Sequence, residues 1–107
     1  MNKAHPSSLN QNREQLRLAV MRVIKANPEV SQRQLAAELG VSLGGVNYAL
    51  KALIERGFVK ADNFRKSGSK AAYLYVLTPA GIAEKSSLAT AFLERKLEEY
   101  EVLRCEI

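Results

Sequence analysis

The sequence has one cysteine, one histidine and no tryptophan. Cys105 and His5 lie near opposite ends of the chain, and neither has a second Cys or His at a metal-ligand spacing. An internal disulfide is impossible, and neither a zinc site nor any other metal or cofactor is expected. Cys105 is expected to be a free thiol, and the alternative is a redox-sensitive disulfide between two copies of the chain.

Clustered catalytic groups and long apolar segments are also missing. Asp62 is the only aspartate, the glutamates are scattered, and no glycine-rich phosphate loop occurs, so enzymatic activity is not expected. No window approaches the roughly 18 uninterrupted apolar residues of a membrane helix, and the first residues contain no apolar signal segment. These absences predict a cytoplasmic protein that does not bind membranes.

Positive charge is present in excess, and it is unevenly distributed. A chain of 107 residues with net charge +5 is long enough for one domain and an appendage. The part up to Ala80 holds 12 Lys or Arg and 5 Asp or Glu, whereas the part from Gly81 holds 4 and 6. The basic part is suited to binding phosphate groups, although an ordinary solvated surface has the same composition.

The amino-terminal part predicts a flexible tail followed by one amphipathic helix. Residues 1–8 contain little apolar content, whereas 9–26 place apolar residues at steps of three and four. Asn27 and Pro28 end this helix, because proline disfavours the helical conformation of the preceding residue. The apolar side chains are Leu16, Ala19, Val20, Val23 and Ile24, and the opposite basic face holds Arg13, Arg17, Arg22 and Lys25. We expect a helix that covers the core and leaves its basic face in solvent.

Residues 31–57 predict two short helices joined by a tight turn. Ser31 and Gln34 form a capping-box pattern, Gly40 suits a left-handed helix end, and Ser42 caps the next helix, which Gly57 ends. Ala36, Gly40 and Val46 occupy the spacing that a close helix crossing, a sharp turn and a locking side chain require. The predicted inward face of the second helix is Val46, Ala49, Leu50, Leu53 and Ile54. The segment therefore predicts a helix-turn-helix.

A β-hairpin is predicted after this helix pair. The segments 58–63 and 71–77 are rich in aromatic, β-branched or other apolar residues, and they flank the basic stretch 64–70. Period-two spacing places Tyr75 and Leu77 on the core side. The basic tip is either a solvated turn or a wing that contacts the DNA backbone.

The last segment predicts a long helix that starts with Thr78 as N-cap and Pro79 as first residue. It extends for about 25 residues, which is longer than so small a domain needs. One apolar stripe holds Ile82, Leu88 and Phe92, and the other holds Ala89, Leu93, Leu97, Tyr100 and Leu103. We expect the second stripe to form a homodimer interface; the alternative is a helix folded back on its own domain.

The order of these elements resembles the MarR-type bacterial regulators. The resemblance lies in Leu53-Ile54-Glu55-Arg56-Gly57-Phe58-Val59 before the wing and Leu77-Thr78-Pro79-Ala80-Gly81 after it, and it extends from Leu16 to Leu103. The segment SQRQLAAELGVSLGGVNYALKALIERGFVK is similar to small MarR-type regulators associated with exopolysaccharide gene clusters. Longer family members dimerise through helices from both ends and bind effectors near that interface. Here only one helix precedes the helix-turn-helix, so dimerisation is expected to rest on the last helix, and no effector is assigned.

The predicted fold is mainly α with a small β-hairpin. We expect a flexible tail (1–8), a winged helix-turn-helix domain (9–81) and a carboxy-terminal dimerisation helix (82–107). The predicted function is sequence-specific binding of double-stranded DNA, with a recognition helix (42–56) in the major groove and the wing (64–70) on the backbone or in the minor groove. The predicted DNA contacts are Ser31, Gln32, Arg33, Ser42, Leu43, Gly44, Asn47, Tyr48, Lys51, Arg65, Lys66 and Lys70. The alternative is a winged helix that binds proteins instead of DNA.

Overall fold

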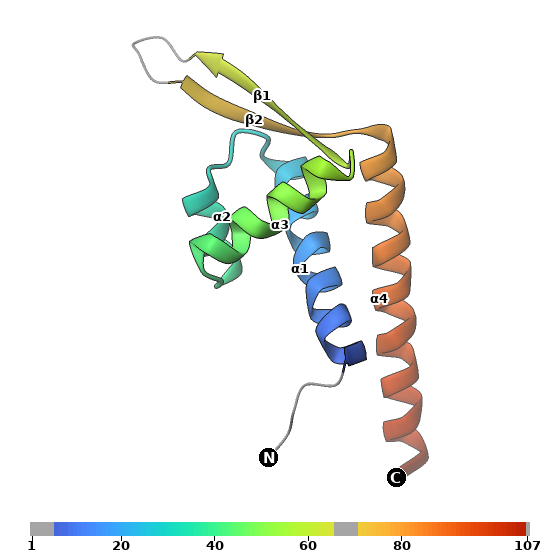
Figure 1. Cartoon of the computed structure of the whole chain (residues 1–107). Helices are drawn as coiled ribbons and strands as arrows, with labels where there is room; N and C mark the ends of the chain where they lie inside the picture. Colours follow the sequence, from blue (N-terminus) through green and yellow to red (C-terminus); the bar gives the residue numbers. More distant parts are fainter. Residues whose placement is uncertain (1–5, 66–70, 107) are drawn as a thin grey trace.

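The computed structural model describes residues 6–65 and 71–106 and contains four helices and one hairpin within them (Figure 1). The order and bounds are α1 (Pro6–Ala26), α2 (Gln32–Leu39), α3 (Leu43–Glu55), β1 (Val59–Arg65), β2 (Ala71–Leu77) and α4 (Pro79–Glu106). This architecture confirms the predicted winged helix-turn-helix with a long last helix. Residues 1–5 of the predicted tail lie outside the described residues.

Helix α1 begins at Pro6, three residues before the predicted start at Leu9. The tail predicted for residues 1–8 is therefore too long at its carboxy-terminal end. Proline is well suited to the first helical position, because its fixed backbone angle is helical and the missing N–H has no partner there anyway. Because this segment contains few apolar residues, apolar periodicity did not indicate the first turn of the helix.

Helix α1 is a central element, and it does more than cover the core. It packs against α3 on one side and α4 on the other (Figure 1). Leu18 and Met21, which fall outside the predicted stripe, are buried at 3% and 0% exposure. A helix with neighbours on two sides buries more than one stripe, so a prediction based on a single amphipathic face was too narrow.

The start of α2 and the turn between α2 and α3 confirm the predicted capping chemistry. Ser31 Oγ accepts a hydrogen bond from Gln34 N at 3.0 Å, and Ser31 N donates to Gln34 Oε1 at 2.8 Å. Gly40 has φ of 67°, a left-handed conformation that glycine adopts without steric cost. Ser42 Oγ accepts from Gly45 N at 3.0 Å and starts α3. The conformation of Gly40 and the Ser42 cap define how α3 leaves the turn.

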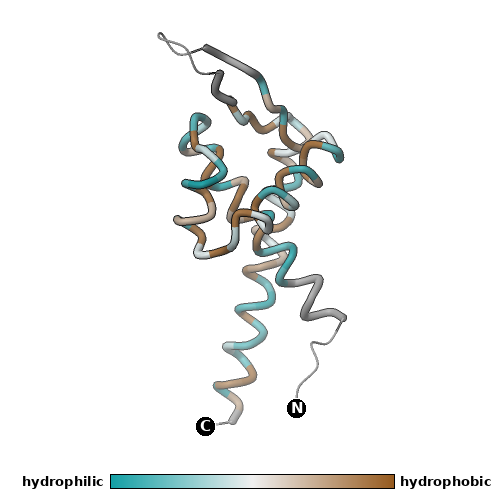
Figure 2. Tube along the Cα trace, turned by 60° about the vertical axis from the view of Figure 1, so that its left-hand side comes forward, coloured by the Kyte–Doolittle hydropathy of each residue, from teal (hydrophilic) through white to brown (hydrophobic). Residues whose placement is uncertain are grey.

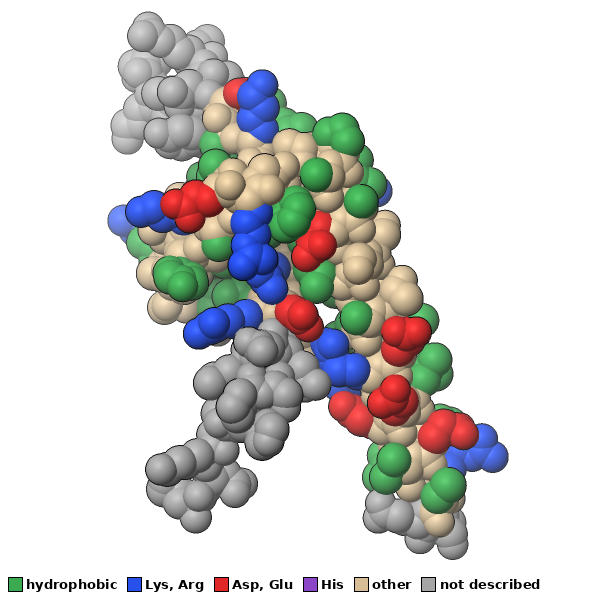
Figure 3. Space-filling view, turned by 45° about the vertical axis from the view of Figure 1, so that its right-hand side comes forward, with side chains coloured by type: hydrophobic (Ala, Val, Ile, Leu, Met, Phe, Trp, Pro, Cys, Tyr) green, Lys and Arg blue, Asp and Glu red, His purple; other side chains and the backbone are tan. Residues whose placement is uncertain are grey.

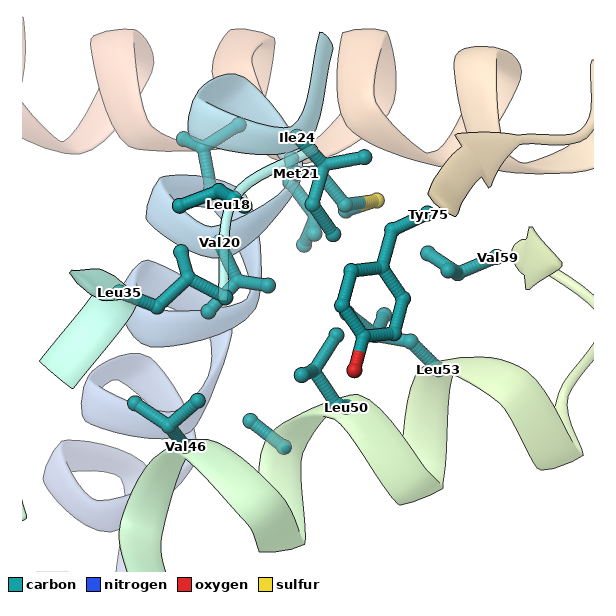
Figure 4. Packing of buried hydrophobic residues seen from close by; sticks show 13 residues of the cluster. Leu18, Val20, Met21, Ile24, Leu35, Val46, Leu50, Leu53, Val59 and Tyr75 are labelled. Atoms are coloured by element: carbon teal, nitrogen blue, oxygen red, sulfur yellow. The ribbon is translucent and has the colours of Figure 1, made fainter. Parts of the chain in front are cut away.

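Strands β1 and β2 are antiparallel, with Val59 opposite Leu77 and Arg65 opposite Ala71. Strand β2 has its predicted bounds, whereas β1 starts one residue later and extends two residues further than predicted, because pairing with β2 continues to Arg65. Tyr75 is 4% exposed, and its N–H donates to Pro28 O at 2.9 Å. Figure 4 shows its ring over α3, beside Leu50 and Leu53. The hairpin is thereby fixed to the helical core.

Helix α4 has one part that packs on the domain and one that does not. Leu88 is buried, and Ala89 and Phe92 pack against the core cluster. Ala89, assigned to the dimer stripe from sequence, therefore contributes to packing within the chain. Leu93, Leu97, Tyr100 and Leu103 are between 54% and 62% exposed. We call these four residues the exposed stripe. Figure 2 shows this part of α4 extending away from the other helices.

Three backbone segments meet where α4 begins. Thr78 Oγ1 donates to Gly57 O at 2.5 Å and accepts from Gly81 N at 3.0 Å, while Thr78 N donates to Phe58 O at 3.1 Å. Gly57 has φ of 78° and Gly81 is buried against the Phe58 backbone. The Leu-Thr-x-x-Gly pattern thus connects the end of α3, the start of β1 and the first turn of α4. We call this the Thr78 junction.

Candidate nucleic-acid interface

Helix α3 has one face in the core and one in solvent. Val46, Ala49, Leu50 and Leu53 are buried, as predicted, whereas Ile54 is 39% exposed because it lies at the edge of the packed face. Tyr48 is 72% and Leu43 44% exposed. The predicted base-reading face is accessible as a whole, because Leu43, Gly44, Asn47, Tyr48 and Lys51 are all exposed.

The first turn of α2 lies beside this face. Its residues and the preceding Ser31 differ in what their side chains contact. Ser31 uses its hydroxyl in the capping box, and Arg33 is exposed. Gln32, predicted to contact phosphate, is half-buried, and its amide bridges two other side chains. Asn47 Nδ2 donates to Gln32 Oε1 at 3.3 Å, and Gln32 Nε2 donates to Tyr75 Oη at 3.4 Å.

This hydrogen-bond chain orients the side chain of Asn47. A bidentate pair with adenine needs one amide oxygen as acceptor and one N–H as donor. Because Gln32 takes only one of the two Nδ2 hydrogens, Asn47 keeps both groups for a base edge. The three side chains are 15 and 43 residues apart in sequence, so no local pattern connects them. The hydrogen bonds that join Asn47, Gln32 and Tyr75 were therefore missed from sequence.

The start of α3 leaves room for another molecule to approach its backbone closely. A Cβ placed on Gly44 would meet no atom within 4 Å, so packing within the chain does not require glycine here. Gly45 differs, because its Cβ would lie 3.2 Å from Ser42 Oγ, the atom that caps the helix. An open helix start exposes backbone N–H groups, which are suited to phosphate oxygens.

The hairpin carries the remaining predicted contacts. Arg65 is the last residue of β1, whereas Lys66 and Lys70 lie outside the described residues. Figure 1 shows both strands extending past α3 on the side where α2 lies. The far ends of the described strands therefore lie on the side of the molecule that holds α2 and the start of α3.

The cations Arg33 on α2 and Lys51 on α3 lack acidic partners in the described part of the chain. The ion pairs between described residues all involve α4: Arg95 with Glu14 at 3.5 Å, Lys96 with Glu99 and Arg104 with Glu101, both at 3.4 Å. Figure 3 shows acidic side chains gathered along the lower part of α4. Arg33 and Lys51 have no such partner among the residues described, so their charge is available to an anion.

The described residues contain neither a candidate metal site nor a candidate membrane span. No group of three or more His, Cys, Asp or Glu side chains could hold a metal ion there. Nor does any helix of this part of the chain have the length and apolar character needed to cross a membrane. Cys105 is exposed.

Comparisons with known proteins agree with this geometry. Residues 13–60 match a family described as winged helix-turn-helix DNA-binding. A search of curated protein sequences finds no significant match. Residues 13–60 contain α2, α3 and most of α1, so the match covers the helices of the candidate interface but only the first two residues of the hairpin.

Several solved structures have the same fold. TA0346, a proposed transcriptional regulator of Thermoplasma acidophilum, aligns with TM-score 0.71 and 17% identity over 87% of this chain and 94% of its own. A MarR/EmrR family transcriptional regulator from Acinetobacter sp. ADP1 aligns with TM-score 0.62 and 20% identity over 79% of this chain and 58% of its own. Lactococcus lactis ZitR in complex with DNA aligns with TM-score 0.58 and 22% identity, covering 86% and 60%.

The chain therefore spans about three fifths of the Acinetobacter and Lactococcus proteins and nearly all of the Thermoplasma one. At these identities the likeness concerns the backbone arrangement. This chain has the winged helix-turn-helix fold, in the form with a long last helix that it shares with MarR-family regulators.

Proposed function

We propose that this protein is a transcriptional regulator that binds double-stranded DNA sequence-specifically through α3. The observation that carries the proposal is the exposed face of α3, which presents Asn47, Tyr48 and Lys51 directly after a capped, rigid turn. Helices of this kind enter the major groove, where Asn pairs with adenine and a cation meets the backbone. The fold of ZitR, solved with DNA, supports the same placement.

Selection from a pool of random duplexes, followed by sequencing of the bound fraction, tests this function. We expect one enriched motif with two-fold symmetry, because a symmetric dimer places two recognition helices on two half-sites. Failure to retain any duplex, or retention without enrichment at low salt, would contradict sequence-specific binding and favour the alternative of a protein-interaction module.

Asn47→Ala is expected to relax base discrimination at one position in each half-site. Loss of the bidentate pair costs about 1 to 3 kcal/mol of discrimination against the wrong base. Lys51→Ala is the control on the same face. It is expected to weaken binding to all duplexes about equally, since it removes a contact to the DNA backbone. The selected motifs of the two variants provide the measurement. An unchanged motif for Asn47→Ala would show that α3 does not read bases through this residue.

The wing is proposed to supply affinity without sequence preference. Arg65→Ala combined with Lys66→Ala is expected to weaken every duplex and to reduce the slope of log K against log salt by about two phosphate equivalents. The matched control removes the same charge from α4 through Lys85→Ala with Lys96→Ala. If both double variants have the wild-type slope, the wing does not contact phosphate.

We further propose that the protein acts as a homodimer joined through the exposed stripe of α4. Four large apolar side chains at steps of three and four residues, each more than half exposed, form a strip that a second copy can bury symmetrically. The resemblance to regulators associated with exopolysaccharide clusters supports such genes as targets. Genome-wide mapping of bound sites in the source cell tests that assignment.

A further inference from the structure

A small cavity between α1 and α3 is lined by three arginines. Arg13 and Arg17 reach it from α1, and Arg56 reaches it from the end of α3. Its volume of about 120 Å³ exceeds the roughly 30 Å³ that one water occupies in the liquid. The other described lining residues are Leu16, Tyr48, Ala49 and Ala52, so no Asp or Glu is among them.

One of these arginines has an unsatisfied donor. Arg17 Nε is buried and has no hydrogen-bond partner among the described residues. A buried N–H without an acceptor is unfavourable, and native structures satisfy nearly all such groups. An oxyanion that enters the cavity would accept hydrogen bonds from the guanidinium groups that line it and would balance their charge.

The position of the cavity indicates where this oxyanion comes from. Tyr48 lines the cavity and also belongs to the exposed face of α3, with 72% of its surface accessible. A helix inserted in the major groove has a phosphate backbone along each flank. The amino-terminal half of α1 lies on one flank of α3, which is where a backbone phosphate would pass.

We propose that Arg13, Arg17 and Arg56 bind one phosphate of the DNA backbone at the flank of the recognition helix. This inference rests on the proposed function and extends the interface to α1, whose basic face was expected to be solvated. The phosphate contact fixes the depth and register of α3 in the groove, because phosphate contacts position a protein without reading sequence.

The test uses the full chain and the duplex enriched by selection. Arg13→Ala and Arg56→Ala change exposed side chains, so both variants are expected to keep the wild-type melting temperature. Each is expected to reduce the salt slope by about 0.9, the value for one phosphate. The salt slope of the double variant is expected to fall no further than that of either single variant, because the residues share one phosphate.

Arg22→Ala is the matched control, since Arg22 is exposed on α1 about 180° around the helix from Arg13. Methylphosphonate substitution of single phosphates is expected to weaken the wild type, but not the double variant, at one position per half-site. Slopes equal to that of Arg22→Ala would overturn the inference while leaving the proposed function intact. If the wild type retains no duplex, both fail.

A thermal-unfolding measurement with inorganic phosphate tests the remaining possibility, that the cavity binds a free anion and not a phosphate of DNA. If millimolar inorganic phosphate raises the melting temperature of the wild type but not of the double variant, and the salt slopes are unchanged, the cavity binds a free anion and the DNA contact is overturned. If the slopes change as expected, the phosphate in the cavity is that of DNA.

Discussion

Gly81→Ala is expected to destabilise the protein by about 3 kcal/mol or more. A Cβ at Gly81 would fall deep inside van der Waals contact with the carbonyl oxygen of Phe58 and 2.9 Å from its carbonyl carbon. Both are backbone atoms, and Phe58 O also accepts from Thr78 N, so they cannot move aside without breaking the Thr78 junction. Thermal unfolding should show a melting temperature lower by more than about 12 °C.

Gly44→Ala is the matched control for this change. Gly44 is also in the first turn of a helix, but no atom lies within 4 Å of its added Cβ. Alanine is the better helix former by up to about 1 kcal/mol, so this variant should be unchanged or slightly more stable. If Gly81→Ala melted within 2 °C of Gly44→Ala, about the effect of half a kcal/mol or less, the close packing at Gly81 would be refuted.

Leu93→Glu combined with Leu97→Glu is expected to convert the proposed dimer into a folded monomer. Both side chains are more than half exposed in the single chain, so glutamate there leaves the domain core intact. In a dimer the carboxylates would be buried without partners, which strongly disfavours association. Sedimentation equilibrium should give the mass of one chain, with helicity as in the wild type. Affinity for a two-half-site duplex should fall by about 10²-fold or more, because the second half-site no longer binds intramolecularly.

Val102→Glu provides the control for the exposed stripe. Val102 is 57% exposed, as Leu93 is, but lies about 140° around α4 from Leu97. It should remain dimeric with full affinity for the duplex. A wild type that sediments as a monomer, or a double glutamate variant that remains a dimer, would exclude the exposed stripe as the interface.

The sequence predicted those parts of the fold that local rules determine. The capping box at Ser31, the left-handed Gly40 and the start of α4 at Pro79 each depend on residues within a few positions of one another. Strand β2 and the inward position of Tyr75 follow from period-two spacing. Such features need no knowledge of the neighbouring elements.

Features that depend on packing between distant segments were not predicted. Leu18 and Met21 are buried because α1 has neighbours on two sides, and Ala89 packs inward because α4 crosses α1 there. The chain from Asn47 through Gln32 to Tyr75 and the cavity at Arg17 connect residues far apart in sequence. Helical periodicity shows which residues share a face, and tertiary contacts decide what that face meets.

The Thr78 junction fixes α4 to the segment that follows α3, so α4 is attached to the helix-turn-helix like a lever arm. Its 28 residues span about 42 Å at 1.5 Å per residue, and Thr78, which precedes its first turn, is hydrogen-bonded to Gly57 just after α3. In the proposed dimer the exposed stripe is centred about 19 residues, or about 29 Å, from the start of α4, so a rotation of about 5° there would displace the helix-turn-helix by about 2.5 Å, somewhat less than the 3.4 Å rise of one base pair. If the protein forms this proposed dimer, a change in the crossing angle of the two α4 helices would change the spacing of the two half-sites.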